Sequence, residues 1–267
     1  MVSSIKTRNN VRILGNGSQT MLFAHGFGCD QNMWRYIVPA FEESYRIVLF
    51  DYVGSGKSDL SAYNASRYNS LNGYADDLLE ICADLDLKDA IFVGHSVSSM
   101  IGIIASIRNP SAFSKLILIG PSARYINDGD YVGGFERRDI EDLLETMDKN
   151  YIGWANFLAP AIMKNPDRPE LGKELVESFC STDPVIARKF AEVTFLSDNR
   201  HDLNKVTLPS LILQCSDDLI APFEVGDYLA GHIPLSTLKV MKATGHCPHM
   251  SHPAETVTLI KEYLQSQ

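Results

Sequence analysis

Short apolar runs rich in β-formers recur along the chain, and stretches with helical spacing separate them. The runs occupy residues 11–14, 20–24, 46–50, 90–94, 115–120, 210–215 and 237–241. Most of them are apolar at every position, which is typical of central parallel strands covered by helices on both faces. Between them, apolar residues fall on one helical face, as at Tyr74, Leu78, Ile81 and Leu85. The alternation predicts an α/β fold with a mostly parallel central sheet flanked by helices.

The alternation stops between residues 122 and 205. Only helical patterns occur there, over about 136–149, 152–163, 169–180 and 184–196, and "NPDRP" and "STDP" interrupt them. An all-helical segment between two strands cannot lie within the sheet. We therefore expect residues 122–205 to form a four-helix cap inserted in a core made of residues 1–121 and 206–267.

The composition of the chain limits the classes of partner that it is expected to bind. The chain has 267 residues, 45% of them hydrophobic, and a formal net charge of −9. That charge disfavours nucleic acids and anionic membranes as partners, because both require a basic surface. No run of about 18 apolar residues and no signal-peptide pattern occurs, so we expect no membrane association and a cytoplasmic location. Five widely spaced cysteines, an odd number, are typical of reduced thiols.

The segment "VGHSVSSM", residues 93–100, joins a predicted strand to a predicted helix at Ser96. A nucleophile elbow has the form Gly-x-Ser-x-Gly, in which small neighbours let strand and helix approach. Here Gly94 supplies the first small residue, but Ser98 replaces the second glycine. We expect the Ser98 hydroxyl to return a hydrogen bond to the preceding turn. Taken alone, the motif fits a nucleophile or a polar turn that opens a helix.

Two later segments provide partners for this serine. "QCSDDLIAP" places Asp217 and Asp218 after the strand 210–215, and "ATGHCPHMSHP" places His246 after the strand 237–241. A serine needs a base to take its proton and an acid to orient that base, and α/β folds build their sites at these strand ends. The order Ser, Asp, His is the one that goes with a nucleophile elbow.

Backbone amides would stabilise the oxyanion of such a reaction. One is the N–H of Val97, directly after the serine. The other would come from "HGFG", residues 25–28, behind the strand 20–24, with Phe27 as the expected donor.

Bulky apolar residues of the cap are candidates to line a pocket over this site, although each of them could equally pack helix against helix. With three residues of the core they predict a chamber for a small hydrophobic ligand, and the candidate substrate-binding residues are Phe27, Val97, Tyr125, Phe135, Trp154, Phe157, Phe195, Leu196 and Ile220.

Other patterns point to weaker alternatives. "DYVGSGKS", residues 51–58, resembles the end of a P-loop, but Asp51 places a carboxylate where the first glycine should lie. A metal site could draw on four residues near the C-terminus, but Pro248 and Pro253 break any helix that would set ligand spacing; these four residues are His246, Cys247, His249 and His252. We expect no metal and no cofactor, and we expect His25 and His95 to be structural hydrogen bonders.

Five segments together resemble one family: "AHGFGCDQNMW", "LFDYVGSGKSD", "GHSVSSMIG", "SDDLIAP" and "GHCPHMSHP". They look like the α/β-hydrolase superfamily, and more narrowly like the RsbQ-type bacterial stress regulators and the plant karrikin and strigolactone receptors. The cap segment "FCSTDPVIARKFA" is also similar to the RsbQ type. The resemblance implies an α/β-hydrolase fold with a Ser96, Asp218, His246 triad and a four-helix lid over a closed hydrophobic pocket. It selects Asp218 over Asp217, because the family's acid lies four residues before a proline, here Pro222.

The resemblance also implies a function. We expect a serine hydrolase that binds and hydrolyses a small hydrophobic ester or lactone. Similarity to the RsbQ type further implies a positive regulator of the general stress (sigma-B type) response, with a PAS-domain phosphatase as protein partner. The alternative is a metabolic carboxylesterase or lactonase with no signalling role.

Overall fold

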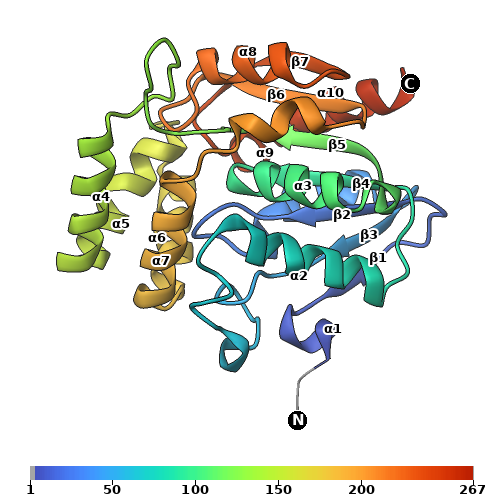
Figure 1. Cartoon of the computed structure of the whole chain (residues 1–267), viewed down its shortest axis with the longest axis horizontal. Coiled ribbons are helices and arrows are strands. Elements are labelled where there is room, and N and C mark those ends of the chain that lie inside the picture. Colours follow the sequence, from blue (N-terminus) through green and yellow to red (C-terminus); the bar gives the residue numbers. More distant parts are fainter. Residues whose placement is uncertain (1–3, 267) are drawn as a thin grey trace.

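The computed structural model describes residues 4–266, and its centre is a seven-stranded sheet (Figure 1). The strand order is β1-β3-β2-β4-β5-β6-β7; β1 runs antiparallel to β3, and every other pair of neighbours is parallel. Each predicted strand is present. The strands are β1 Arg12–Leu14, β2 Thr20–Ala24, β3 Arg46–Leu49, β4 Ala90–His95, β5 Phe113–Ile119, β6 Ser210–Asp217 and β7 Ser236–Thr244.

Successive residues of each strand point to opposite faces of the sheet, and each face has its own apolar core. On one face, Leu22 and Ile212 pack with residues of three helices, α2 (Leu71–Asp84), α3 (Val97–Arg108) and α8 (Phe223–His232). On the other, Phe23 and Leu213 pack with residues of a 3-10 helix, η1 (Gln31–Tyr36), of the C-terminal helix α10 (Pro253–Gln265) and of the cap. Burial on both faces explains why the strands read as continuous apolar runs.

Four helices lie between β5 and β6 in the chain: α4 Arg137–Lys149, α5 Tyr151–Met163, α6 Pro169–Ser181 and α7 Pro184–Phe195. Their starts are encoded locally. Glu136 and Asp139 form a capping box at α4, the Asn150 side chain accepts from the Gly153 amide at α5, and the Asp183 side chain caps α7. The four helices stand together beyond the carboxyl end of the sheet, on the left in Figure 1. We use the word cap for residues 122–205.

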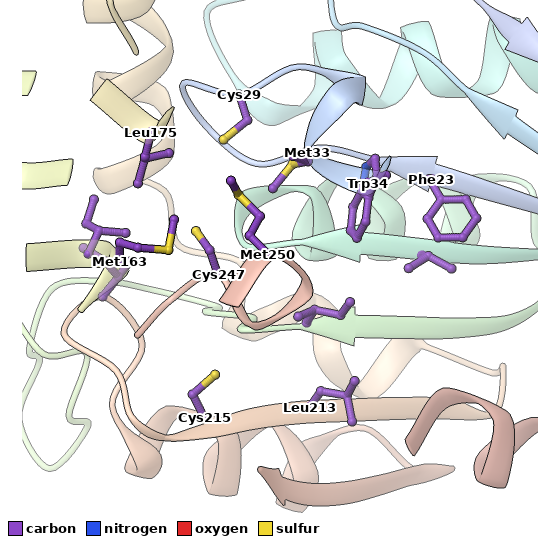
Figure 2. Close-up of a cluster of buried hydrophobic side chains, with 14 of the residues drawn as sticks. Phe23, Cys29, Met33, Trp34, Met163, Leu175, Leu213, Cys215, Cys247 and Met250 are labelled. Carbon is purple, nitrogen blue, oxygen red and sulfur yellow. The ribbon is translucent and has the colours of Figure 1, made fainter. Parts of the chain in front are cut away.

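The apolar core continues from the sheet into the cap without a break. Figure 2 shows side chains reaching from Leu175 and Met163 of the cap, through Cys29 and Cys247, to Trp34 in the core. Many of these side chains carry sulfur, which adapts to irregular gaps.

Among the α-helices, α1 (Ile5–Arg8), α8 and α9 (Pro248–Ser251) were not predicted, and neither were the 3-10 helices. Short helices lack the several turns that make a periodic pattern legible. Between residues 4 and 266, no helix is long and apolar enough to cross a membrane.

Candidate active site

Ser96 lies between the last residue of β4 and the first residue of α3, in a strained conformation. Its φ of 56° and ψ of −124° are rare for a residue with a side chain, and its amide donates to the Ile119 carbonyl at 2.8 Å. Strain of this kind is typical of a nucleophile elbow. Gly94 is required here, because a Cβ on it would come within 2.9 Å of the Ser98 backbone. The polar-turn alternative does not account for a strained serine held in this way.

Ser98, which replaces the usual second glycine, does not bond to the preceding turn as expected. Its hydroxyl donates to the His25 carbonyl at 2.5 Å, and the Tyr52 hydroxyl lies 3.0 Å from the same Ser98 oxygen. Both partners come from other strand ends, so sequence proximity could not reveal them. The residue therefore joins α3 to the loop that begins at His25.

Three side chains from distant segments form one hydrogen-bonded line. The Ser96 hydroxyl lies 2.7 Å from His246 Nε2, and His246 Nδ1 lies 2.7 Å from Asp218 Oδ2. Gly120, with a φ of 57°, leaves room beside the imidazole, since a Cβ there would lie 3.2 Å from His246 Cε1. This is the geometry in which a base takes the serine proton while an acid orients the ring.

Asp218 is held as a charged acceptor. Burial would raise the pKa of its carboxyl group, but the facing His246 ring and hydrogen bonds from the Ile220 and Ala221 amides outweigh burial and lower the pKa below its usual value. Its neighbour Asp217 is exposed, and its carboxylate pairs with Lys164. The structure thus separates the two acids that the residues alone left open.

The loop at His25 fixes the direction of the Phe27 amide. His25 Nε2 accepts from the Tyr52 amide at 3.2 Å, so Nδ1 carries the ring proton and donates to the Gly26 carbonyl at 2.9 Å. The N–H of Phe27 points opposite to that carbonyl, because both belong to one trans peptide. Within residues 4–266, no acceptor takes a hydrogen bond from this N–H, which leaves it available to an oxyanion.

For Val97, the backbone N–H, rather than the side chain, is the group expected to face the oxyanion. It is the first residue of α3, where an amide has no partner inside the helix. Its side chain packs in the apolar core on the α2 and α3 face of the sheet, away from the chamber described next. Its expected place among the substrate-contacting side chains was therefore wrong.

A small chamber lined by Ser96 lies between the core and the cap. The space open to the centre of a water molecule within it is about 30 Å³. Of the predicted liners, four are present: Phe27, Tyr125, Phe195 and Ile220. A chamber this small admits an ester only when side chains or cap helices shift.

The other predicted liners lie elsewhere. Trp154 is buried but does not line the chamber; it stacks on Phe179, with ring centroids 5.2 Å apart, and Phe135 packs edge-on against Phe195. Phe157 was predicted wrongly, because 81% of it is exposed on the outer face of α5. Leu196 was also wrong: it is 40% exposed and borders a separate surface groove between α7 and the α2–α3 face. Composition cannot tell which face of a cap helix turns inward when both faces carry apolar groups.

Sequence reasoning missed several residues of the chamber. Leu175 and Phe179, one helical turn apart on α6, form its wall, and a Cβ on Gly28 would come within 2.3 Å of the Phe179 ring. Their i, i+4 spacing marked an apolar stripe but not what it faces. The remaining missed liners are Cys29, His95, Ile162, Thr194 and Cys247.

The cap is bound directly to the histidine loop. The His246 amide donates to the Ile162 carbonyl at the end of α5, and the Asn165 side chain donates to the Thr244 carbonyl at 3.1 Å. Arg168 donates to the Ser251 carbonyl. A shift of this part of the cap therefore acts on the backbone that carries the base.

The P-loop alternative is inconsistent with the geometry. Asp51 is buried, and its carboxylate accepts from the amides of Gln31 and Lys57, each at 2.9 Å. The amides that would cradle a phosphate are therefore partly occupied by a carboxylate.

The four candidate metal ligands do not converge. His246 belongs to the triad, and His249 lies between Trp34 and His95. In the described part of the chain, no group of three or more ligating side chains is gathered. His95 donates from Nε2 to the His246 carbonyl at 2.7 Å, as expected of a structural hydrogen bonder.

Comparison with known proteins agrees with this geometry. The model of the "Alpha/beta hydrolase family" matches residues 21–259. This chain belongs to the α/β-hydrolase family. It is an enzyme of the serine-hydrolase type.

Several known proteins are similar to this chain over nearly its whole length. It is 40% identical over 256 residues to the "Strigolactone esterase D14" of Arabidopsis thaliana, covering 96% of each chain. It is 38% identical over 261 residues to the "Karrikin insensitive 2 receptor CA" of Petunia hybrida, covering 97% of each. A solved hydrolase from Oleispira antarctica is 48% identical, with a TM-score of 0.96, covering 98% of this chain and 97% of that one. Relatives named as esterases and as receptors thus both share this fold and length.

Proposed function

We propose that this α/β hydrolase cleaves small hydrophobic esters or lactones. The observation that carries the proposal is the line from Ser96 through His246 to Asp218, with 2.7 Å at each step. His246 Nε2 takes the hydroxyl proton as Ser96 Oγ attacks the carbonyl carbon, and Asp218 stabilises the imidazolium. The amides of Phe27 and Val97 stabilise the oxyanion.

Collapse of the tetrahedral intermediate breaks the bond to the leaving alcohol, which takes its proton from His246. A water then attacks the acyl-enzyme with His246 again acting as base, and the acid and Ser96 are released. In a lactone the leaving alcohol stays attached to the acyl chain, so ring opening and hydrolysis give one hydroxy acid.

The walls limit the substrate. Phe27, Phe179 and Phe195 make most of the chamber apolar, and among residues 4–266 no carboxylate or ammonium group lines it apart from the buried triad. A charged substrate would lose its hydration there without a partner. This favours small neutral esters and lactones, the class suggested by relatives whose names include esterases.

Covalent labelling tests the proposal directly. A fluorophosphonate probe should phosphonylate the protein once, at the Ser96 hydroxyl, with loss of fluoride, and peptide mass spectrometry would locate the label. The Ser96→Ala protein should remain unlabelled and should lose turnover of short p-nitrophenyl esters. The hydrolase proposal fails if the wild type is neither labelled nor faster than Ser96→Ala.

A signalling role is a second proposal, supported by the resemblance to RsbQ-type regulators and by relatives that are named receptors. In it, the chain is a positive regulator of the general stress response, the chamber senses a small hydrophobic ligand, and a PAS-domain phosphatase is the protein partner. The contacts between the cap and the His246 loop offer a route from ligand to surface.

Deletion and complementation in the native host test this role. A strain without the gene should fail to induce its energy-stress genes, and the wild-type gene should restore induction. Normal induction in the deletion strain would leave a metabolic carboxylesterase or lactonase. Restoration by the Ser96→Ala gene would show that signalling does not need hydrolysis.

A further inference from the structure

Two buried hydroxyl groups of the chamber make no hydrogen bond of standard geometry in the described part of the protein, although the Ser96 hydroxyl lies near one of them. They are Tyr125 Oη and Thr194 Oγ1, and each residue is only 1% exposed. Both residues line the chamber over Ser96. Buried polar groups are nearly always hydrogen-bonded, so two such groups without a standard hydrogen bond, on residues that line one cavity, require an explanation.

The Thr194 hydroxyl departs from its counterparts. Threonine in a helix commonly donates to the carbonyl four residues earlier. Three others in this chain do so: Thr146 to Asp142, Thr256 to His252 and Thr258 to Ala254. The Thr194 hydroxyl of α7 does not donate to the carbonyl four residues earlier, that of Phe190.

The Tyr125 hydroxyl faces the reacting group. It lies close to the Ser96 hydroxyl, and its ring packs edge-on against Phe195, with centroids 5.1 Å apart. Burial raises the pKa of this phenol, and the smaller opposite influence of Ser96 does not offset it. Tyr125 therefore keeps its proton and is a neutral donor at neutral pH.

A ligand that fills the chamber removes any water that could satisfy these groups. The free space is about 30 Å³, which holds at most a few waters and none beside a bound ester. A hydrocarbon chain would then leave both hydroxyls unpaired, whereas an oxygen in that chain would accept from them. Sites that offer hydrogen bonds to a ligand discriminate strongly against analogues that lack the matching atom.

We propose that Tyr125 and Thr194 form a polar subsite that selects esters or lactones bearing at least one acceptor oxygen beyond the scissile carboxyl group, such as a keto, ether or hydroxyl oxygen. This inference rests on the proposed hydrolase function and narrows its substrate class. It requires no further group and no covalent step beyond ester hydrolysis.

Matched substrates test the subsite. The p-nitrophenyl esters of pentanoate, levulinate and methoxypropanoate have acyl chains of similar length, and the last two carry an additional oxygen. For each, kcat/KM is divided by the rate of alkaline hydrolysis, which removes the intrinsic reactivity of the ester. The wild type should prefer the better oxygenated ester over pentanoate by about tenfold or more.

Conservative variants show which hydroxyl causes the preference for the oxygenated ester. Tyr125→Phe and Thr194→Val keep the size of each side chain, and at least one should reduce the preference by about five- to tenfold, mainly through the oxygenated ester. Tyr74→Phe is the matched control, because the Tyr74 hydroxyl is also buried and unpartnered within residues 4–266 but does not line the chamber. Melting temperatures show whether each variant folds.

The outcomes separate the two proposals. A wild-type preference near one, or a preference unchanged in both variants, overturns the subsite and leaves the hydrolase proposal standing. Absence of any ester turnover or labelling overturns the hydrolase proposal instead. In that case, thermal shifts of the Ser96→Ala protein with methyl levulinate and methyl pentanoate decide the subsite: a larger shift with levulinate, lost in Thr194→Val or Tyr125→Phe, supports it, and equal shifts overturn it.

Discussion

The two sides of the chamber hold their residues by different forces. On the core side, Ser96, His246 and Asp218 are placed by hydrogen bonds at strand ends. On the cap side, Phe179 and Phe195 are placed by contacts with Phe27, at ring distances of 5.8 and 6.1 Å. Hydrogen bonds fix atoms in distance and direction, whereas apolar packing tolerates exchange of similar volumes. The core therefore determines the position of the catalytic groups, and the cap determines which substrates the chamber can hold.

The sharpest test of the core side compares two adjacent acids. Asp218→Asn should lower kcat by roughly ten-thousandfold, because the amide no longer holds His246 in the required tautomer. Asp217→Asn changes an exposed neighbour paired with Lys164 and should leave kcat within about twofold. Steady-state kinetics on one p-nitrophenyl ester measures both. Equal effects from the two substitutions would contradict the assignment of the acid.

Ser98 gives the next largest effect. Ser98→Ala removes the donor to the His25 carbonyl and leaves that buried carbonyl and the Tyr52 hydroxyl short of a partner. We expect kcat to fall about tenfold with KM little changed, because the loop that presents the Phe27 amide loses a support. Ser106→Ala, whose serine bonds only within α3, is the control. A change confined to KM would mean that Ser98 acts on substrate binding instead.

Acid should destabilise the core side through two buried histidines. Burial and the nearby His246 ring lower the pKa of His95 to about 3, and burial lowers that of His249 well below its usual value. Unfolded histidine takes up a proton near pH 6.5, so below that pH the unfolded state binds more protons and stability falls. The expected slope is about 1.4 kcal/mol per pH unit for each such histidine.

Urea unfolding between pH 7.5 and 5 measures this slope. In the His249→Phe protein, the slope of the unfolding free energy against pH should fall by about the contribution of one histidine. The slope should not change in His201→Gln, which alters an exposed position. Equal slopes in all three proteins would exclude His249 as a source of acid sensitivity.

The smallest expected effect concerns the outer face of the cap. Phe157→Ser should leave kcat/KM within about twofold and the free energy of unfolding within about 0.5 kcal/mol, since the ring is exposed. Phe179→Ser, one helix away but inside the chamber, should raise KM. A marked loss of turnover in Phe157→Ser would mean that this ring reaches the substrate in a state that the structure does not describe.

The sequence alone predicted the strands, the four long cap helices and the order of the polar residues at the strand ends. Short local segments encode these features: continuous apolar runs, N-caps such as Asp183, and glycines at turns. The triad could be proposed from them because parallel strands bring their carboxyl ends to one edge, whatever the details of packing. The choice of Asp218 over Asp217 needed either a family resemblance or coordinates, since both acids follow the same strand.

Only the tertiary structure decided which apolar side chains face the ligand. Phe157 and Phe179 are both aromatic residues of cap helices, yet one is in solvent and the other lines the chamber. It also decided that Ser98 bonds to His25 and that the Tyr125 and Thr194 hydroxyls make no standard hydrogen bond to any described residue. The physical reason is the same in each case: a side chain's partner is set by the packing of elements distant in sequence, and no local pattern records that packing.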